Sequence, residues 1–475
     1  KCDGARPICG QCMRGDRAED CEYAANSSYS RTQGLEDTIA RMEARIRELE
    51  NPDNGQGAKL VLRNPYFANE FQQLPSSDLP VSSHVAPSKH QPIDRFLHSA
   101  VEVGFFLNTN RFRQSSLRDL PHGHHERPHP VLLSAAYLWG IHLTGEPYTQ
   151  HEDAILTRAL SQLTGSLSST HPQRIMHTIQ AKVLLIHYLY ANGRLLEGKY
   201  HTSSVVGLAL AARLNKVRSS EVIDANPLPA PVDSVEEGER IRACWTIFSL
   251  DKCWAVAFDS PPNTHCPAEM AGQQLDTPWP LEMAEYEQVS AFSNRTSYTL
   301  QNFLNEIPAS DSGDSALGFL AKGAILWELS TKIFHQFRAA SGQTLATHID
   351  TFKRLDRLID QVIASIERAS LGRKEYILPR CIASAAAIRL HSGLANTNPL
   401  SRGKCLIAAE AIVLSLNSIP DLDSAYANPI IAVSSLLAPP SSHRFSLPFY
   451  HIFLVRVDSG FASHLRRGHF MAFGR

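Results

Sequence analysis

The chain has 475 residues, of which 43% are hydrophobic and 20% are charged, and its formal net charge is −1 at pH 7. This length allows more than one domain and a sizeable core, and the ordinary composition argues against a fibrous or wholly disordered chain. No uninterrupted apolar run reaches the roughly 18 residues that a membrane-spanning helix needs, and we expect no membrane partner.

Cysteines gather at the start of the sequence. Four of the nine, Cys2, Cys9, Cys12 and Cys21, are spaced C-x6-C-x2-C-x8-C. Such a cluster indicates either a metal site or disulfides, but disulfide scaffolds are typical of small secreted domains, and this chain is long. Cys9 and Cys12 form a C-x2-C knuckle that lets two sulfurs reach one tetrahedral ion. We therefore expect Zn²⁺ as cofactor, with all four cysteines as ligands.

Residues 1–23, KCDGARPICGQCMRGDRAEDCEY, resemble the second half of the fungal zinc binuclear cluster, the DNA-binding module of a large class of transcription factors. In that family six cysteines bind two zinc ions. Cys2 matches the third cysteine, Pro7 the loop proline, and Cys9, Cys12 and Cys21 the last three cysteines. The resemblance implies that Cys9 bridges the two ions, with Cys2 on one ion and Cys12 and Cys21 on the other.

The family's opening C-x2-C and its basic helix, whose lysines read a CGG triplet in the major groove, are not in this sequence. Lys1 corresponds to the last residue of that helix and is the expected DNA-binding residue. The charges within residues 1–21, Lys1 included, cancel, so the electrostatic footprint that phosphate binding needs is missing. We expect a truncated DNA-binding protein whose full-length form binds double-stranded DNA with CGG-type half-sites in the nucleus.

A short coiled coil is predicted at residues 35–50, after a small, polar linker at 24–34. Its apolar residues recur at alternating steps of four and three: Leu35, Ile39, Met42, Ile46 and Leu49. With isoleucine at positions a and the others at d, the pattern favours a parallel homodimer. The alternative is a single amphipathic helix packed on the domain, because two heptads are marginal alone. Position favours the coiled coil, since the family commonly dimerises just after its zinc cluster.

A second linker is predicted at 51–91, followed by a large all-α domain at 92–431 without sustained strand alternation. Helices are predicted from Ile93, from His129 through Trp139, over 175–190, from Ser234 to about Val256, and over 317–339, 345–369, 375–393 and 405–417. The helix at Ser234 is expected to begin with the capping box Ser234-x-x-Glu237. Residues 432–475 read as an irregular tail, and an aberrant gene-model end explains them equally well.

The domain at 92–431 resembles the fungal-specific transcription factor domain, a large helical regulatory domain. Two stretches carry the resemblance: Leu196 to Leu214, and Glu239 through Trp245 and Leu250-Asp251-Lys252 to Ser260-Pro261-Pro262. It implies a non-enzymatic, zinc-dependent regulator of RNA polymerase II transcription, with a small-molecule effector or co-regulators as further partners. The alternative is a helical ligand-binding or enzymatic module with a structural zinc, but no catalytic motif supports an enzyme.

Two other patterns receive structural interpretations. Gly193 to Lys199 fits the phosphate-binding pattern G-x4-G-K, but Tyr200 stands where Ser or Thr must hold magnesium, so a turn between helices is favoured. Histidines are dense at His122, His124, His125 and His129, and the neighbouring proline and glycine favour a solvated surface loop over a metal site.

Overall fold

The computed structural model describes residues 3–15, 21, 39–40, 43, 91–145, 148–219, 227–264, 274–288, 298–308, 313–339, 344–370, 373–418 and 428–431. The chain divides into two compact units, Lys1–His84 and Val85–Arg475. Within the described residues all regular structure is helical and no strand occurs, which confirms the all-α fold class. None of the described helices combines the length and apolar character needed to cross a membrane.

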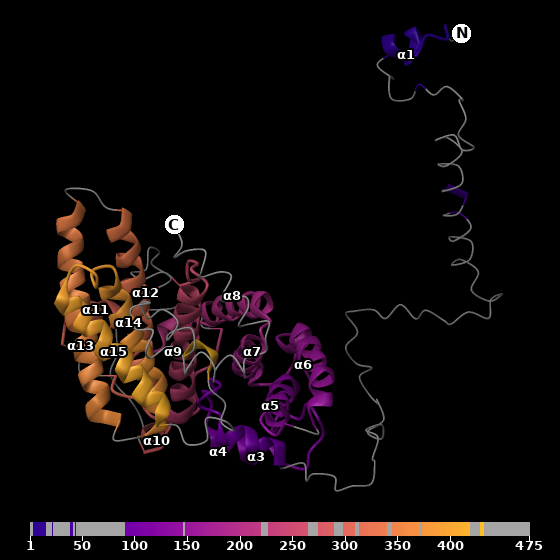
Figure 1. The fold of residues 1–475 in the computed structure, drawn as a ribbon. Helices are drawn as coiled ribbons and strands as arrows, with labels where there is room; N and C mark the ends of the chain where they lie inside the picture. Colours follow the sequence, from indigo (N-terminus) through magenta and orange to yellow (C-terminus); the bar gives the residue numbers. More distant parts are fainter. Residues whose placement is uncertain are drawn as a thin grey trace. The chain divides into compact units, whose positions relative to one another are not determined.

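The second unit is a succession of helices (Figure 1). They are α3 (Gln91–His98), α4 (Thr109–Ser116), α5 (Pro130–His142), η4 (Tyr148–His151), α6 (Glu152–Ser166), α7 (Arg174–Ala191), α8 (Leu195–Ala211), η5 (Leu214–Lys216), α9 (Ser234–Ala257), α10 (Met283–Gln288), α11 (Thr299–Leu304), α12 (Ala316–Ala339), α13 (Thr344–Ser370), η7 (Lys374–Tyr376), α14 (Ile377–Ser392) and α15 (Pro399–Asn417).

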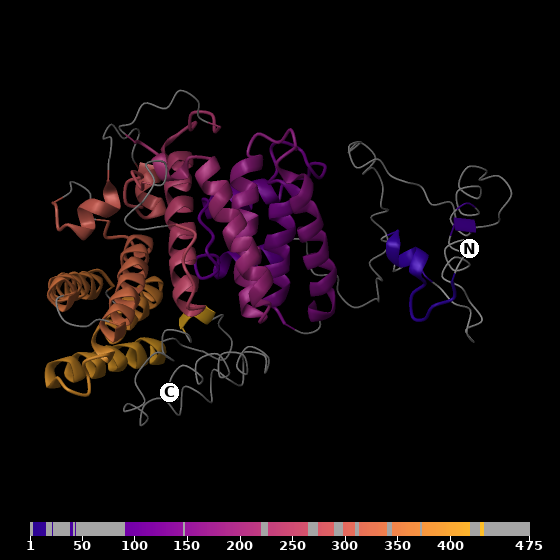
Figure 2. The same ribbon diagram turned by 90° about the horizontal axis from the view of Figure 1, so that it is seen from above.

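Helix α9 lies between two groups of helices, α5 to α8 on one side and α12 to α15 on the other (Figures 1 and 2). It packs directly against α7, α8, α10 and α12, and nearly all of its residues are buried. A helix covered all round buries polar side chains along with apolar ones, and those polar groups require partners.

The Leu-Asp-Lys motif of α9 contributes two charged side chains, Asp251 and Lys252, that are buried and have polar partners. The Lys252 ammonium, fully buried, lies 2.8 Å from Oε2 of Glu328 on α12 and also donates to the carbonyl of Thr264. The Asp251 carboxylate accepts hydrogen bonds from the backbone N–H groups of Asn263 (3.0 Å) and Thr264 (2.9 Å). The motif therefore fixes the loop that follows α9 and joins α9 to α12.

The predicted start of α9 is wrong by one residue. Asp233, not Ser234, is the N-cap, and its Oδ1 accepts the backbone N–H of Glu236 at 2.9 Å. The Glu236 carboxylate in turn accepts the N–H of Val232 at 2.8 Å. Ser234 is the first helical residue, and its hydroxyl donates to the carbonyl of Tyr286 at 2.8 Å. Both Asp and Ser are favourable N-caps, so sequence alone does not separate them.

Helix boundaries agree with prediction for α7, α12 and α13 to within a residue or two, whereas α15 begins six residues before its predicted start at Cys405. Asn398 caps α15 by accepting N–H bonds from Leu400 and Ser401, and Pro399 occupies the first turn, where no N–H partner is needed. The turn between α7 and α8 lies at residues 192–194, with Gly193 at a φ of 70°, and residues 195–199 of the G-x4-G-K pattern already belong to α8.

Candidate metal centre

The first unit contains a short helix, α1 (Gly10–Arg14), that begins at a cysteine. Cys9 is its N-cap, and the backbone N–H of Cys12 points to the Cys9 sulfur at 3.5 Å. The Asp3 carboxylate accepts the Gly10 N–H at 3.0 Å. A Cβ at Gly10 would lie 2.5 Å from an Asp3 carboxylate oxygen, so glycine permits this close approach. Asp3 thus fixes the loop before α1.

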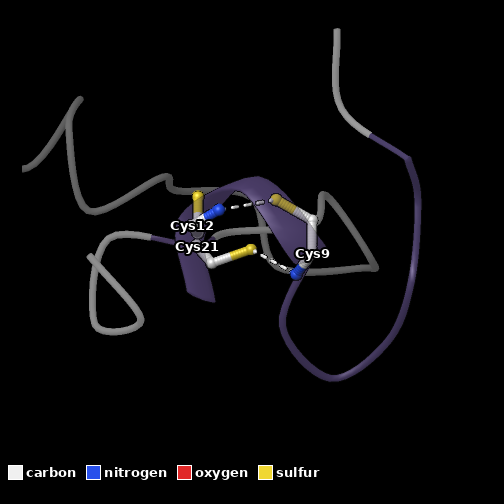
Figure 3. Close-up of side chains that lie close together, drawn as sticks. All are labelled: Cys9, Cys12 and Cys21. Atoms are coloured by element: carbon white, nitrogen blue, oxygen red, sulfur yellow. Dashed lines mark hydrogen bonds between the residues drawn. The ribbon is translucent and has the colours of Figure 1, made fainter. Parts of the chain in front are cut away.

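Three sulfurs meet at this helix (Figure 3). The Sγ atoms of Cys9, Cys12 and Cys21 all lie within 4.8 Å of one another, and the Cys9 N–H points to the Cys21 sulfur at 3.2 Å. In a tetrahedral Zn–thiolate site with Zn–S bonds of about 2.3 Å, neighbouring sulfurs are about 3.8 Å apart. Cys9 and Cys21 are 12 residues apart in sequence, yet their sulfurs meet beside that of Cys12. The three cysteines therefore fit the donor set and spacing of a zinc site.

The neighbouring sulfurs raise the pKa of Cys12. The pKa of Cys12 is raised to about 11, first by its hydrogen bond with Cys9, then by partial desolvation and by the neighbouring Cys21. The Cys12 thiol therefore resists losing its proton unless a cation neutralises the thiolate. A metal ion supplies that charge, and binding it expels the thiol protons.

Of the other predicted site residues of the first unit, the structure describes only Ile39. Lys1, Cys2, Leu35, Met42, Ile46 and Leu49 lie outside the described residues. Ile39 is described, is helical, and is 52% exposed. The coiled coil and the fourth ligand therefore remain predictions.

The histidine-rich loop divides into two environments. His124 and His125 stack on each other with ring centroids 4.3 Å apart, whereas His129 is buried and caps α5 through an Nδ1 that accepts the Val131 N–H at 3.3 Å. His129 instead contacts His171 and lies beside His177, which belong to the segment that opens α7. No sequence pattern links His171 and His177 to the histidine-rich loop, because they lie more than 40 residues after it along the chain.

The other described cysteines lie in the core of the helical unit. Cys244, Cys253, Cys381 and Cys405 are buried, and burial raises the thiol pKa of each. Cys266 lies outside the described residues. The four described cysteines act as small core side chains.

Comparison with known proteins bears on the second unit. The family described as "Fungal specific transcription factor domain" matches residues 96–357, more than half of the 475-residue chain. No match was found among curated proteins or among solved structures. The match includes both resemblance stretches and the central helix α9. The chain therefore belongs to the family of transcription regulators that carry a fungal specific transcription factor domain.

Proposed function

We propose that this chain is a zinc-dependent, sequence-specific DNA-binding regulator of RNA polymerase II transcription that acts in the nucleus. The observation that carries the proposal is the convergence of the Cys9, Cys12 and Cys21 sulfurs in a chain that also contains a fungal specific transcription factor domain. Zn²⁺ would be held by these three cysteines with Cys2 as the fourth ligand, and it would act as a structural crosslink rather than as a catalyst.

The residues around the sulfurs have positioning roles in this proposal. Asp3 holds the loop before α1 through its bond to Gly10, and the Cys9 cap orients the helix that carries Cys12. Lys1 stands at the expected DNA-facing end of the module. CGG-type half-sites in double-stranded DNA are the proposed target, bound by a homodimer whose seam is formed by residues 35–50.

DNA recognition can be tested by fluorescence anisotropy with a duplex containing two CGG triplets and a scrambled duplex of equal composition. The 475-residue chain is expected to bind both equally. A chain extended before Lys1 by a Cys-x2-Cys segment followed by lysines and arginines should prefer CGG, with affinity that falls steeply as salt rises. Cys9→Ala in the extended chain should abolish the preference, and Cys405→Ala in the helical unit should not. Absence of preference in the extended chain would contradict the proposal.

Self-association can be tested by analytical ultracentrifugation. Replacing Ile39 and Ile46 together by Asp places charges at both a positions of the proposed seam and should convert a dimer to a monomer. Replacing Arg41 and Glu43, which lie off the a and d positions, by Ala serves as the control and should leave the mass unchanged. An unchanged mass in the Asp double variant would rule out this seam as the dimer contact.

A further inference from the structure

A polar pocket of about 340 Å³ opens in the second unit. It lies between α4, the loop that precedes α5, and the first turns of α7 and α9, and its apolar wall includes Leu107, Phe112 and Val232. This volume is within the range of about 300–1,000 Å³ that small-molecule sites occupy. The pocket is distinct from the cysteine cluster, which belongs to the first unit.

The pocket contains four carboxylates, and three of them have an arginine partner. These pairs are Asp233 with Arg111 at 2.7 Å, Glu236 with Arg240 at 2.7 Å, and Glu126 with Arg118. Glu239 differs: its Oε1 accepts the backbone N–H of Asn108 at 2.8 Å, and within the described part of the chain no basic side chain forms an ion pair with it. Glu239 is the carboxylate whose charge the protein leaves without a direct counterion.

Two histidines that line the pocket, His171 and His177, supply hydrogen bonds rather than positive charge. The backbone N–H of His129 donates to Nδ1 of His177 at 3.2 Å, so the ring proton of neutral His177 is on Nε2. Burial lowers the pKa of His177 to about 3. Nε2 of His171 bonds to the Arg127 carbonyl at 2.8 Å, and burial lowers its pKa as well. Both rings are therefore neutral at physiological pH.

The charged groups around Glu239 act on its pKa in opposite directions. Arg111 favours its ionised form, Asp233 and Glu236 oppose it, and burial opposes it most, so the pKa of Glu239 is raised to about 7. Arg127 is held away from the carboxylates, because its guanidinium donates to the carbonyls of Leu120 and Ser116. A cation that entered the pocket would provide the charge that Glu239 lacks.

We propose that this pocket binds a small protonated amine, with the ammonium group on the Glu239 carboxylate and the apolar part of the ligand against Phe112 and Val232. Amine binding drives Glu239 to its ionised form and so releases a proton. Glu239 lies on α9, and Lys252 of the same helix forms an ion pair with Glu328 on α12. A ligand bound to Glu239 would therefore contact the helix at the centre of the domain. This inference goes beyond the proposed function and does not depend on DNA binding.

The test is isothermal titration calorimetry of the full chain with n-butylammonium chloride, with sodium butyrate at equal ionic strength as the opposite-charge probe. We expect saturable binding of butylammonium, weakened about tenfold or more in Glu239→Gln, which keeps the side-chain size and an acceptor for the Asn108 N–H. Glu410→Gln is the matched control, because Glu410 is exposed on α15 and does not line the pocket. It should leave affinity unchanged.

A second measurement does not require a variant to fold. A pH-stat titration of the wild-type chain at pH 7 should show release of about half a proton per butylammonium bound, because Glu239 with a pKa of about 7 is half protonated there. Three results would overturn the inference: no saturable binding of butylammonium, equal affinity in Glu239→Gln, or binding without proton release. Preferential binding of butyrate would overturn it too. None of these outcomes bears on DNA recognition, so the two proposals fail separately.

Discussion

The two units of the chain differ in how much of their described structure is buried. Among the described residues of the first unit, Cys9 alone is buried, whereas the second unit has a continuous apolar core that reaches from α3 to α15. A module with almost no core relies on metal–thiolate bonds for its order, while a large core supports a domain without them. The two units should therefore respond independently to metal removal and to core substitutions.

The largest expected effect is on metal binding. Cys12→Ser removes a sulfur from a site of four thiolates at most and should reduce bound zinc from about one ion per chain to nearly none, since structural zinc is lost when its ligand set is incomplete. Elemental analysis measures the stoichiometry. Far-ultraviolet circular dichroism of the same variant should retain the helical signal. A stoichiometry of two zincs per chain would contradict the four-ligand assignment.

A substitution in the core of the second unit should lower the stability of that unit and leave zinc binding unchanged. Lys252→Ala removes the fully buried ion-pair partner of Glu328, whose other carboxylate oxygen keeps Lys332 at 2.6 Å, and breaking a buried pair costs up to about 3–5 kcal/mol. Urea denaturation monitored by circular dichroism measures this loss, and zinc content should not change. Lys353→Ala, on the exposed surface of α13, is the matched control and should change stability by less than about 0.5 kcal/mol.

Acid should weaken the second unit through its buried imidazoles. Burial lowers the pKa of His129 to about 4 and that of His177 to about 3 from 6.5, so between these values the unfolded chain binds protons that the folded chain does not. Stability is therefore full above pH 6.5 and falls as pH drops below it, by about 1.5–2 kcal/mol per histidine at pH 5.

Urea titrations at pH 7.5 and pH 5 measure this acid sensitivity. His177→Gln should reduce the difference between the two pH values by about 2 kcal/mol, because one imidazole no longer titrates. His98→Gln, on the exposed face of α3, should leave the difference as it is in the wild type. An identical pH dependence in wild type and His177→Gln would contradict this account.

The smallest expected effect separates the two candidate caps of α9. Asp233→Ala removes the side-chain acceptor of the Glu236 N–H and should cost about 1 kcal/mol, with a further small loss from the exposed Arg111 ion pair. Ser234→Ala removes one hydrogen bond to Tyr286 and should cost less. Thermal denaturation of both variants decides the order, and a larger loss in Ser234→Ala would restore the capping box first predicted from the sequence.

Sequence patterns predict long helices with apolar stripes best, and α12 and α13 have the expected bounds. The short polar helix α4 was not predicted, because a single buried phenylalanine, Phe112, gives no periodicity over eight residues. The C-x2-C knuckle indicated Cys9 and Cys12 as candidate metal ligands because the two cysteines are local in sequence. The pocket around Glu239 could not be predicted in the same way, since Asn108 and His177 reach it from distant segments.

The burial of α9 on all sides also has a consequence for the motions of the domain. An amide exchanges its hydrogen for deuterium only when its helix opens, and a helix packed against α7, α8, α10 and α12 opens only when those contacts separate together. The amides of α9 should therefore exchange at the rate of global unfolding, while those of α4 exchange through local opening, because α4 buries only Phe112 and Ser116. The amides of the segment that carries the Leu-Asp-Lys motif should therefore exchange among the slowest of those in the described helices.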